Sequence, residues 1–91
     1  MVKDERRTVA GAGPTREALL DYLRREWPDS VDVVAKEVAP GASAGDFFEA
    51  CTSLQHEGLI MYEALVLGVG PSPKLLAAAL TRKGHEAALQ R

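Results

Sequence analysis

The stretch GDFFEACTSLQHEGLI, residues 45–60, combines an amphipathic helix with an abrupt stop. Phe47, Cys51 and Leu54 recur at intervals of four and three, which predicts a buried stripe along one face of the helix. Gly58 suits the left-handed position that follows the last helical turn. We therefore expect a helix that ends just before Gly58 and leads directly into a strand.

The periodicity of the rest of the chain predicts the other elements. We expect helices over residues 15–27, 30–39 and 44–57, strands over 60–67 and 74–80, and a short closing helix over 81–90. Pro14 suits a first helical turn, and Ser43 or Asp46 is a candidate N-cap of the third helix. Thr81 is the expected cap of the closing helix, and VGPSP at 69–73 predicts a turn between the two strands.

Composition indicates one small domain in a reducing compartment. The 91 residues include a single cysteine, so no internal disulfide can form, and the net charge is only −2. Residues 1–13 predict a flexible N-terminal arm, because KDERR is mixed in charge and AGAGP is rich in glycine. We expect residues 14–91 to form the domain. The start of the chain lacks the apolar run of a signal peptide and no stretch is long enough to span a membrane, so we expect a cytoplasmic protein with no membrane contact.

Two short motifs resemble those of a known fold. LQHEGLI at 54–60 resembles the exit from the third helix in winged-helix regulators of the MarR type, and LTRKG at 80–84 resembles the segment that leaves their wing. The chain is also similar to the small YjcQ-like winged-helix group, in which a Phe precedes the same leucine as Phe47 precedes Leu54. The resemblance implies an α+β fold, the winged helix-turn-helix, with three helices, a two-stranded wing and a short C-terminal helix. It also implies a DNA-binding transcriptional regulator of bacterial or phage type.

The outward positions of the third helix do not suit DNA. They are expected to be Phe48, Glu49, Thr52, Ser53 and His56. Of these, Thr52, Ser53 and His56 could hydrogen-bond to DNA, together with Lys74, Arg82 and Lys83 outside the helix. However, residues 39–73 contain no Lys or Arg, and phosphate contacts normally supply most non-specific affinity. The missing bases therefore disfavour DNA as a partner, and DNA binding stays the alternative.

The predicted hairpin favours contact with a protein instead. ALVLG and LLAAAL are apolar at successive positions, whereas a half-buried hairpin should alternate apolar and polar residues. One face can cover the helices, but the other face must be exposed or covered by the last helix or a partner. Exposed apolar patches on small domains usually mark contact sites.

No constellation of residues supports catalysis. Cys51 and His56 are five residues apart, about 140° around a helix, so they cannot form a nucleophile and its base. Cys51 is expected to be a buried structural thiol, and Cys51, His56 and His85 are too scattered for a zinc site. AGAGPT lacks the lysine and the preceding strand of a phosphate-binding loop.

These observations predict a non-catalytic winged-helix domain that acts through protein–protein interaction. The expected partner-binding residues are Phe48, Glu49, Thr52, Ser53 and His56, and no cofactor or metal is expected. The partner is either another protein or a second copy of the chain, because winged-helix domains often pair through terminal helices or wings. The alternative is the DNA-binding regulator, with Thr52, Ser53, His56, Lys74, Arg82 and Lys83 as its contacts.

Overall fold

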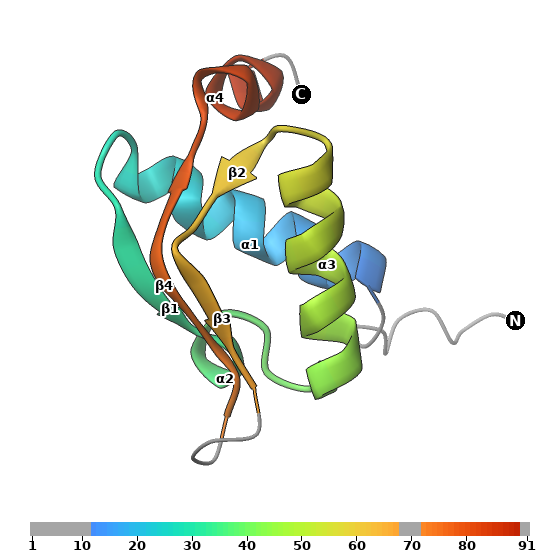
Figure 1. Ribbon diagram of the computed structural model, residues 1–91. Coiled ribbons are helices and arrows are strands. Elements are labelled where there is room, and N and C mark those ends of the chain that lie inside the picture. Colours follow the sequence, from blue (N-terminus) through green and yellow to red (C-terminus); the bar gives the residue numbers. More distant parts are fainter. Residues whose placement is uncertain (1–11, 68–71, 90–91) are drawn as a thin grey trace, which may run out of the picture.

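The computed structural model describes residues 12–67 and 72–89, and it shows a small α+β domain (Figure 1). Within these residues lie four helices and a small antiparallel sheet. In chain order the elements are α1 (Ala12–Glu26), β1 (Val31–Val34), α2 (Ala35–Val38), α3 (Ala44–His56), β2 (Ile60–Met61), β3 (Ala64–Val66), β4 (Lys74–Leu80) and α4 (Arg82–Leu89).

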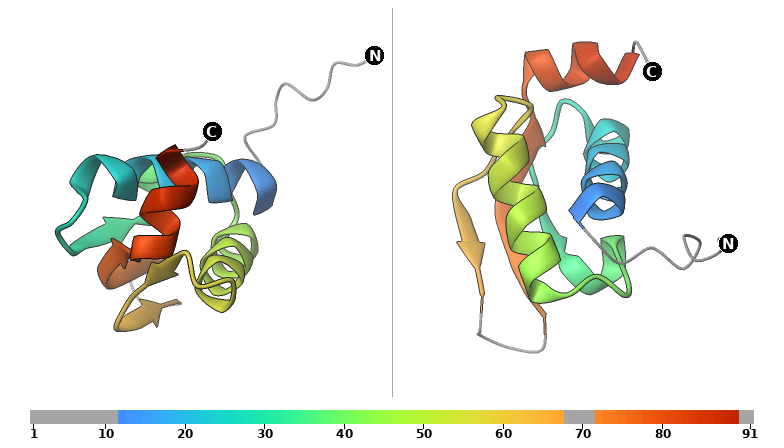
Figure 2. Two further views of the ribbon diagram at one scale, coloured as in Figure 1. Left: turned by 90° about the horizontal axis from the view of Figure 1, so that it is seen from above. Right: turned by 90° about the vertical axis from the view of Figure 1, so that its right-hand side faces the viewer.

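Strand β4 is the centre of the sheet. β1 pairs with it antiparallel on one side, and β2 and β3 pair with it in succession on the other side. Helices α1 and α3 cover one face of this sheet and α4 lies across its end, whereas no described helix lies across the opposite face (Figure 2). The sheet therefore has one face in the core and one face open.

The core lies between the sheet and helices α1 and α3. Leu23, Phe47, Leu54 and Leu75 are all fully buried there. The stripe predicted for the third helix is confirmed, because Phe47, Cys51 and Leu54 are each 0% exposed. Burial of apolar side chains of this size contributes about 1.5–3 kcal/mol each, so this contact between helices and sheet is the main source of stability.

The predicted helix over 30–39 is wrong for its first half. Val31–Val34 is the strand β1, and only the four residues of Ala35–Val38 are helical. Val33 packs into the core opposite Leu75, whereas Asp32 points the other way. Over four residues, VDVV fits the period of a helix as well as that of a strand. Its β-branched valines favour the strand, because β4 is available to pair with it.

Other predicted boundaries shift at the ends of elements. Helix α1 begins at Ala12, so residues 12 and 13 of the predicted arm are helical, and residues 1–11 lie outside the described part of the chain. The strand predicted over 60–67 is divided into β2 and β3 at Tyr62 and Glu63. The strand predicted over 74–80 is confirmed. Most of the turn predicted at 69–73 lies outside the described residues, as do residues 90–91 after α4.

Helix α4 is attached by the residues of the LTRKG motif. The Thr81 hydroxyl accepts a hydrogen bond from the Gly84 N–H at 3.0 Å, which confirms Thr81 as the cap of this helix. The same hydroxyl donates to the Gly58 carbonyl oxygen. A Cβ atom on Gly84 would lie 2.0 Å from the Leu59 carbonyl oxygen, so only glycine fits at this crossing. His85 then stacks on Trp27 of the loop after α1, with ring centroids 4.3 Å apart.

Among the described residues, no helix is long and apolar enough to cross a membrane.

Candidate functional site: the outward face of the third helix

Both ends of α3 are set by local hydrogen bonds. At the N-terminus, Ser43 and Asp46 form a reciprocal capping box, with bonds of 3.0 Å and 3.2 Å, so the two candidate caps act together. At the C-terminus, Gly58 has φ +80° and Leu59 N–H donates to the Leu54 carbonyl oxygen at 2.9 Å. This pattern is a Schellman motif, and it ends the helix where the sequence predicts.

The buried residues of α3 determine which of its side chains face outward. Phe47, Ala50, Cys51 and Leu54 are fully buried against α1 and the sheet. Burial raises the pKa of the Cys51 thiol to about 12, so the group stays neutral at physiological pH. The structural role predicted for this cysteine agrees with its position. The residues between these four face outward.

The five predicted contact residues divide into two groups. Phe48 is 46% exposed, and Glu49 and His56 are also exposed. Thr52 and Ser53 are only half-exposed, and their hydroxyls are already engaged. Thr52 Oγ1 donates to the Phe48 carbonyl oxygen at 2.9 Å, one turn back along the same helix.

Ser53 belongs to a polar cluster that joins α3 to α1. Arg16 donates from one guanidinium nitrogen to Ser53 Oγ at 2.7 Å and to Glu57 Oε2 at 2.9 Å. Its second nitrogen donates to Glu57 Oε1 at 3.1 Å, so the Arg16–Glu57 pair is bidentate. Ser53 Oγ also donates to Glu57 Oε2 at 3.2 Å. The hydrogen bonds from Arg16 hold the pKa of the Glu57 carboxyl below its usual value.

Sequence reasoning did not find this cluster. Ser53 and Glu57 are four residues apart on one helix, which is a visible signal for contact. Arg16 lies 41 residues from Glu57 in the chain, and nothing local to it indicates that it faces α3. Within this cluster the Ser53 hydroxyl joins α3 to α1 through Arg16.

The cations that approach α3 are both bound within the domain. Arg16 is paired with the Glu57 carboxylate. Lys83 Nζ donates to the Glu57 main-chain carbonyl oxygen at 2.9 Å, at the negative end of the helix. In the described part of the chain, the exposed surface of α3 therefore consists of apolar, neutral polar and acidic side chains.

The other DNA contacts of the alternative reading lie at opposite ends of β4. Lys74 is the first residue of β4, and Arg82 and Lys83 follow the end of this strand. A seven-residue strand is about 20 Å long at the usual rise per residue, so β4 separates these cations by roughly that distance.

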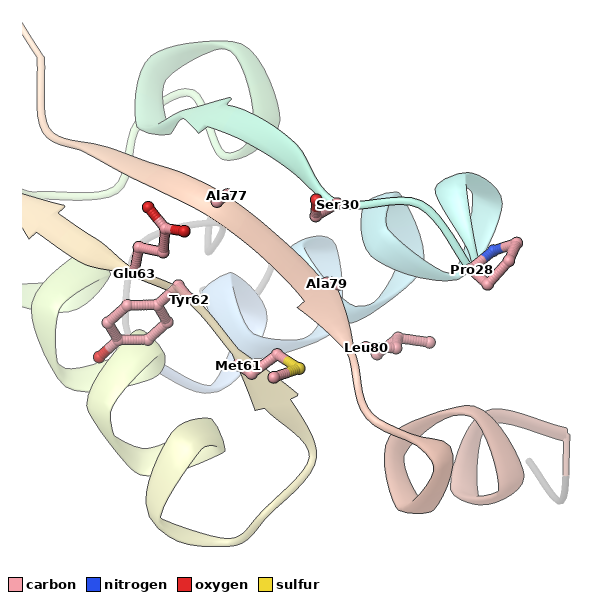
Figure 3. Close-up of a pocket in the computed structure, with 8 residues that line it drawn as sticks. All are labelled: Pro28, Ser30, Met61, Tyr62, Glu63, Ala77, Ala79 and Leu80. Atoms are coloured by element: carbon pink, nitrogen blue, oxygen red, sulfur yellow. The ribbon is translucent and has the colours of Figure 1, made fainter.

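A groove on the open face of the sheet is a second candidate site (Figure 3). Its volume is about 390 Å³. Ala77 and Ala79 of β4 form its floor, with Met61, Tyr62 and Glu63 on one side and Pro28 and Ser30 on the other. The sequence signal for this groove was the run of apolar residues in the predicted hairpin, whose second face had to be exposed or covered by the last helix or a partner.

No known protein family, curated protein sequence or solved structure matches this chain.

Proposed function

We propose that this chain is a winged-helix domain whose third helix docks a protein partner and does not read DNA. The element order supports the winged-helix assignment, because a helix, a strand, two further helices and a hairpin follow one another and β1 pairs with the second hairpin strand. In this assignment β3 and β4 form the wing, and α3 takes the position of a recognition helix.

The observation that carries the proposal is that the hydroxyl groups on α3 already make hydrogen bonds within the domain. A helix that reads DNA presents free donors to base edges and cations to phosphates. Here the Thr52 hydroxyl is bonded to its own helix and the Ser53 hydroxyl to Arg16 and Glu57. The side chains of α3 that remain exposed include Phe48 beside Glu49, and Gln55 and His56 about two turns further along, and none of the four is a lysine or an arginine.

The docking residues then have distinct roles. Phe48 is the anchor, because an aromatic ring that is buried on binding can supply much of the energy of an interface. Glu49 repels phosphate and pairs with a basic residue of the partner. His56 lies at the edge of this contact. The Thr52 hydroxyl is bonded within α3 and the Ser53 hydroxyl joins α3 to α1, so neither hydroxyl is assigned to the partner.

Photo-crosslinking tests this proposal. A photo-reactive phenylalanine analogue at position 48 should crosslink to one discrete partner in cells of the source organism, and the same analogue at Glu17, an exposed position on α1, should not. Phe48→Ala, checked for folding by circular dichroism, should lose the partner that crosslinking identifies when the two purified proteins are mixed. Glu49→Lys should weaken the same complex.

The DNA reading predicts a different result for the unaltered protein. It should bind duplex DNA at moderate salt, with a steep fall of affinity as salt rises. Tight duplex binding that is lost on replacing Thr52, Ser53 and His56 together, and retained in Phe48→Ala, would overturn the proposal and favour the regulator.

A further inference from the structure

The groove on the open face of the sheet is acidic. Glu63 is the only charged residue among those that line it, and its side chain points toward Ala77 on the floor (Figure 3). Asp32 reaches the same point from β1, because its carboxylate accepts the hydrogen bond from the Ala77 N–H at 3.0 Å. Asp29 lies between two further lining residues and is also exposed. Two carboxylates thus flank Ala77 from opposite sides of β4, and a third lies by the opposite wall of the groove.

The two carboxylates beside Ala77 are not neutralised within the described part of the chain. The ion pairs found there involve neither Asp32 nor Glu63. Lys74 lies three residues before Ala77 on the same strand, which is about 10 Å at the usual rise per residue. Arg82 lies five residues after Ala77, beyond the end of β4. The groove therefore presents uncompensated negative charge to a ligand.

An organic cation complements this groove better than a metal ion does. Among the described residues, no three His, Cys, Asp or Glu side chains gather closely enough to hold a metal ion. The space between the walls is about 390 Å³, at the lower end of the range of ligand pockets, and its floor is apolar. A guanidinium group has N–H donors on two edges, so one such group can meet a carboxylate on either side. Its weakly hydrated planar faces and its methylene stem suit walls of alanine and methionine.

We propose that the groove binds an arginine side chain carried by an extended segment of a partner protein. The guanidinium group lies over Ala77, between the carboxylates of Asp32 and Glu63. The two backbones on either side of β4 are about 10 Å apart at the usual strand spacing, which leaves room for one planar cation between their side chains.

The floor of the groove indicates an extended segment rather than a small cation. Ala77 and Ala79 are two positions apart on β4, about 7 Å, and side chains on one face of an extended chain repeat at the same interval. A segment that follows β4 therefore places its arginine over Ala77 and a second side chain over Ala79. Met61 pairs with Ala79 across the strands and is 56% exposed, so this second side chain is apolar. Helix α3 covers the opposite face of the sheet (Figure 2), so the groove is independent of the partner proposed for α3.

NMR titration of the isotope-labelled full chain tests the inference. The probe is the acetylated and amidated peptide Leu-Ser-Arg-Ser-Leu, which presents the same side-chain pattern in both chain directions. It should shift the amide signals of Ala77 and Ala79 with a Kd on the order of 1 mM, because exposed ion pairs are individually weak. The same peptide with citrulline, the uncharged analogue of arginine, should bind at least about tenfold more weakly, because it loses both ion pairs.

Single variants assign the effect to the two carboxylates. Asp32→Asn removes the charge and keeps an acceptor for the Ala77 N–H, and Glu63→Gln removes the charge on the other side. Each should weaken binding of the arginine peptide by about threefold to fivefold, the usual size for an exposed ion pair. Glu49→Gln is the matched control, because it removes an exposed carboxylate from α3, beyond the other face of the sheet. It should bind the peptide like the unaltered chain.

Equal binding of the arginine and citrulline peptides would overturn the inference, as would equal binding by Asp32→Asn, Glu63→Gln and the unaltered chain. So would shifts confined to α3, or no shift with up to about 5 mM peptide. Acetylarginine amide that binds as tightly as the peptide would overturn the extended segment in favour of a small cation. Signals of Ala77 and Ala79 that change on dilution of the protein alone would overturn it in favour of a second copy. None of these measurements uses Phe48, so failure of docking at α3 would leave the result unchanged.

Discussion

Asp32 and Ala77 lie 45 residues apart in the chain, and Asp32 Oδ1 accepts a hydrogen bond from the Ala77 N–H at 3.0 Å. Ala77 has φ +55°, in the left-handed region that non-glycine residues rarely adopt. Between Val31 and Val33 the pairing of β1 with β4 shifts by one residue, so β4 carries a bulge at this point. The bulge takes the Ala77 N–H out of the hydrogen-bond pattern between β1 and β4, and the Asp32 carboxylate accepts a hydrogen bond from it instead.

Replacement of Ala77 should report the strain at the bulge. Ala77→Gly should raise the free energy of unfolding by up to about 1 kcal/mol, because glycine adopts positive φ without steric cost. Ala78→Gly is the control, since Ala78 is buried at the next position and has no positive φ. It should lower stability by about 1 kcal/mol, as measured by urea unfolding. Destabilisation of equal size in both variants would show that the bulge is not strained.

Removal of the Asp32 acceptor should destabilise the bulge. Asp32→Ala leaves the Ala77 N–H without its partner and should cost about 1 kcal/mol in urea unfolding. In the Ala77→Gly background, Asp32→Ala should lower the free energy of unfolding by less. Glycine at position 77 adopts positive φ readily, so the bulge depends less on the hydrogen bond to Asp32. Strictly additive losses would contradict this coupling.

Gly84 should not tolerate a side chain. In Gly84→Ala the new Cβ meets the Leu59 carbonyl oxygen, so α4 must move away from the domain, at a cost of about 2–3 kcal/mol. Gly45→Ala is the matched control, because a Cβ there lies 3.7 Å from Ser43 Oγ, an ordinary contact. That variant should be as stable as the original chain or more stable by up to about 1 kcal/mol. Thermal unfolding followed by circular dichroism distinguishes the two.

Cys51 should react with thiol reagents only after unfolding. Its side chain is fully buried and burial raises the pKa of the thiol to about 12, so on the order of one molecule in 10⁴ carries the reactive thiolate at pH 8. Reaction with a disulfide reagent should be slow in the native protein and fast in urea. Cys51→Ala should cost about 1 kcal/mol, whereas Cys51→Arg should unfold the domain because it buries an unpaired charge. Rapid reaction of the native protein would contradict the buried position.

The Arg16–Glu57 pair should make stability depend on acid pH. Hydrogen bonds from Arg16 lower the pKa of Glu57 in the folded state below its ordinary value of 4.5, so the pair stabilises the fold above that pH. This contribution is lost as pH falls from 4.5 through the lowered pKa of the folded state. Between pH 7 and pH 3 the urea midpoint of the original chain should therefore fall further than that of Glu57→Gln. A carboxyl titration by NMR should also show the pKa of Glu57 rising in Arg16→Gln.

Local sequence was sufficient to predict α3 and both of its ends. The spacing of Phe47, Cys51 and Leu54, the cap at Ser43 and the glycine at position 58 all act within one or two turns. Interactions of this range are encoded by residues that are near one another in the chain, so periodicity and capping rules predict them. The same holds for the cap of α4 at Thr81.

The open face of the sheet could be anticipated only in part. The apolar run in the hairpin predicted a second face that is exposed or is covered by the last helix or a partner, but the sequence did not show which residues would line the groove. Val31–Val34 became a strand because β4 was free to pair with it, and the short VDVV segment has no strong preference of its own. The bulge at Ala77 follows from that pairing, so it could not be read from either strand alone.

The sequence by itself determined that the third helix is amphipathic, capped at both ends and without a cation of its own. Only the tertiary structure decided which of its outward side chains are available to a partner. Arg16 of α1 reaches Ser53 and Glu57 across 37 and 41 residues of chain, and Lys83 of α4 reaches the Glu57 carbonyl oxygen across 26 residues. Periodicity places a side chain on a face of its own helix. The groups that meet it there come from distant segments, whose positions depend on how the whole core packs.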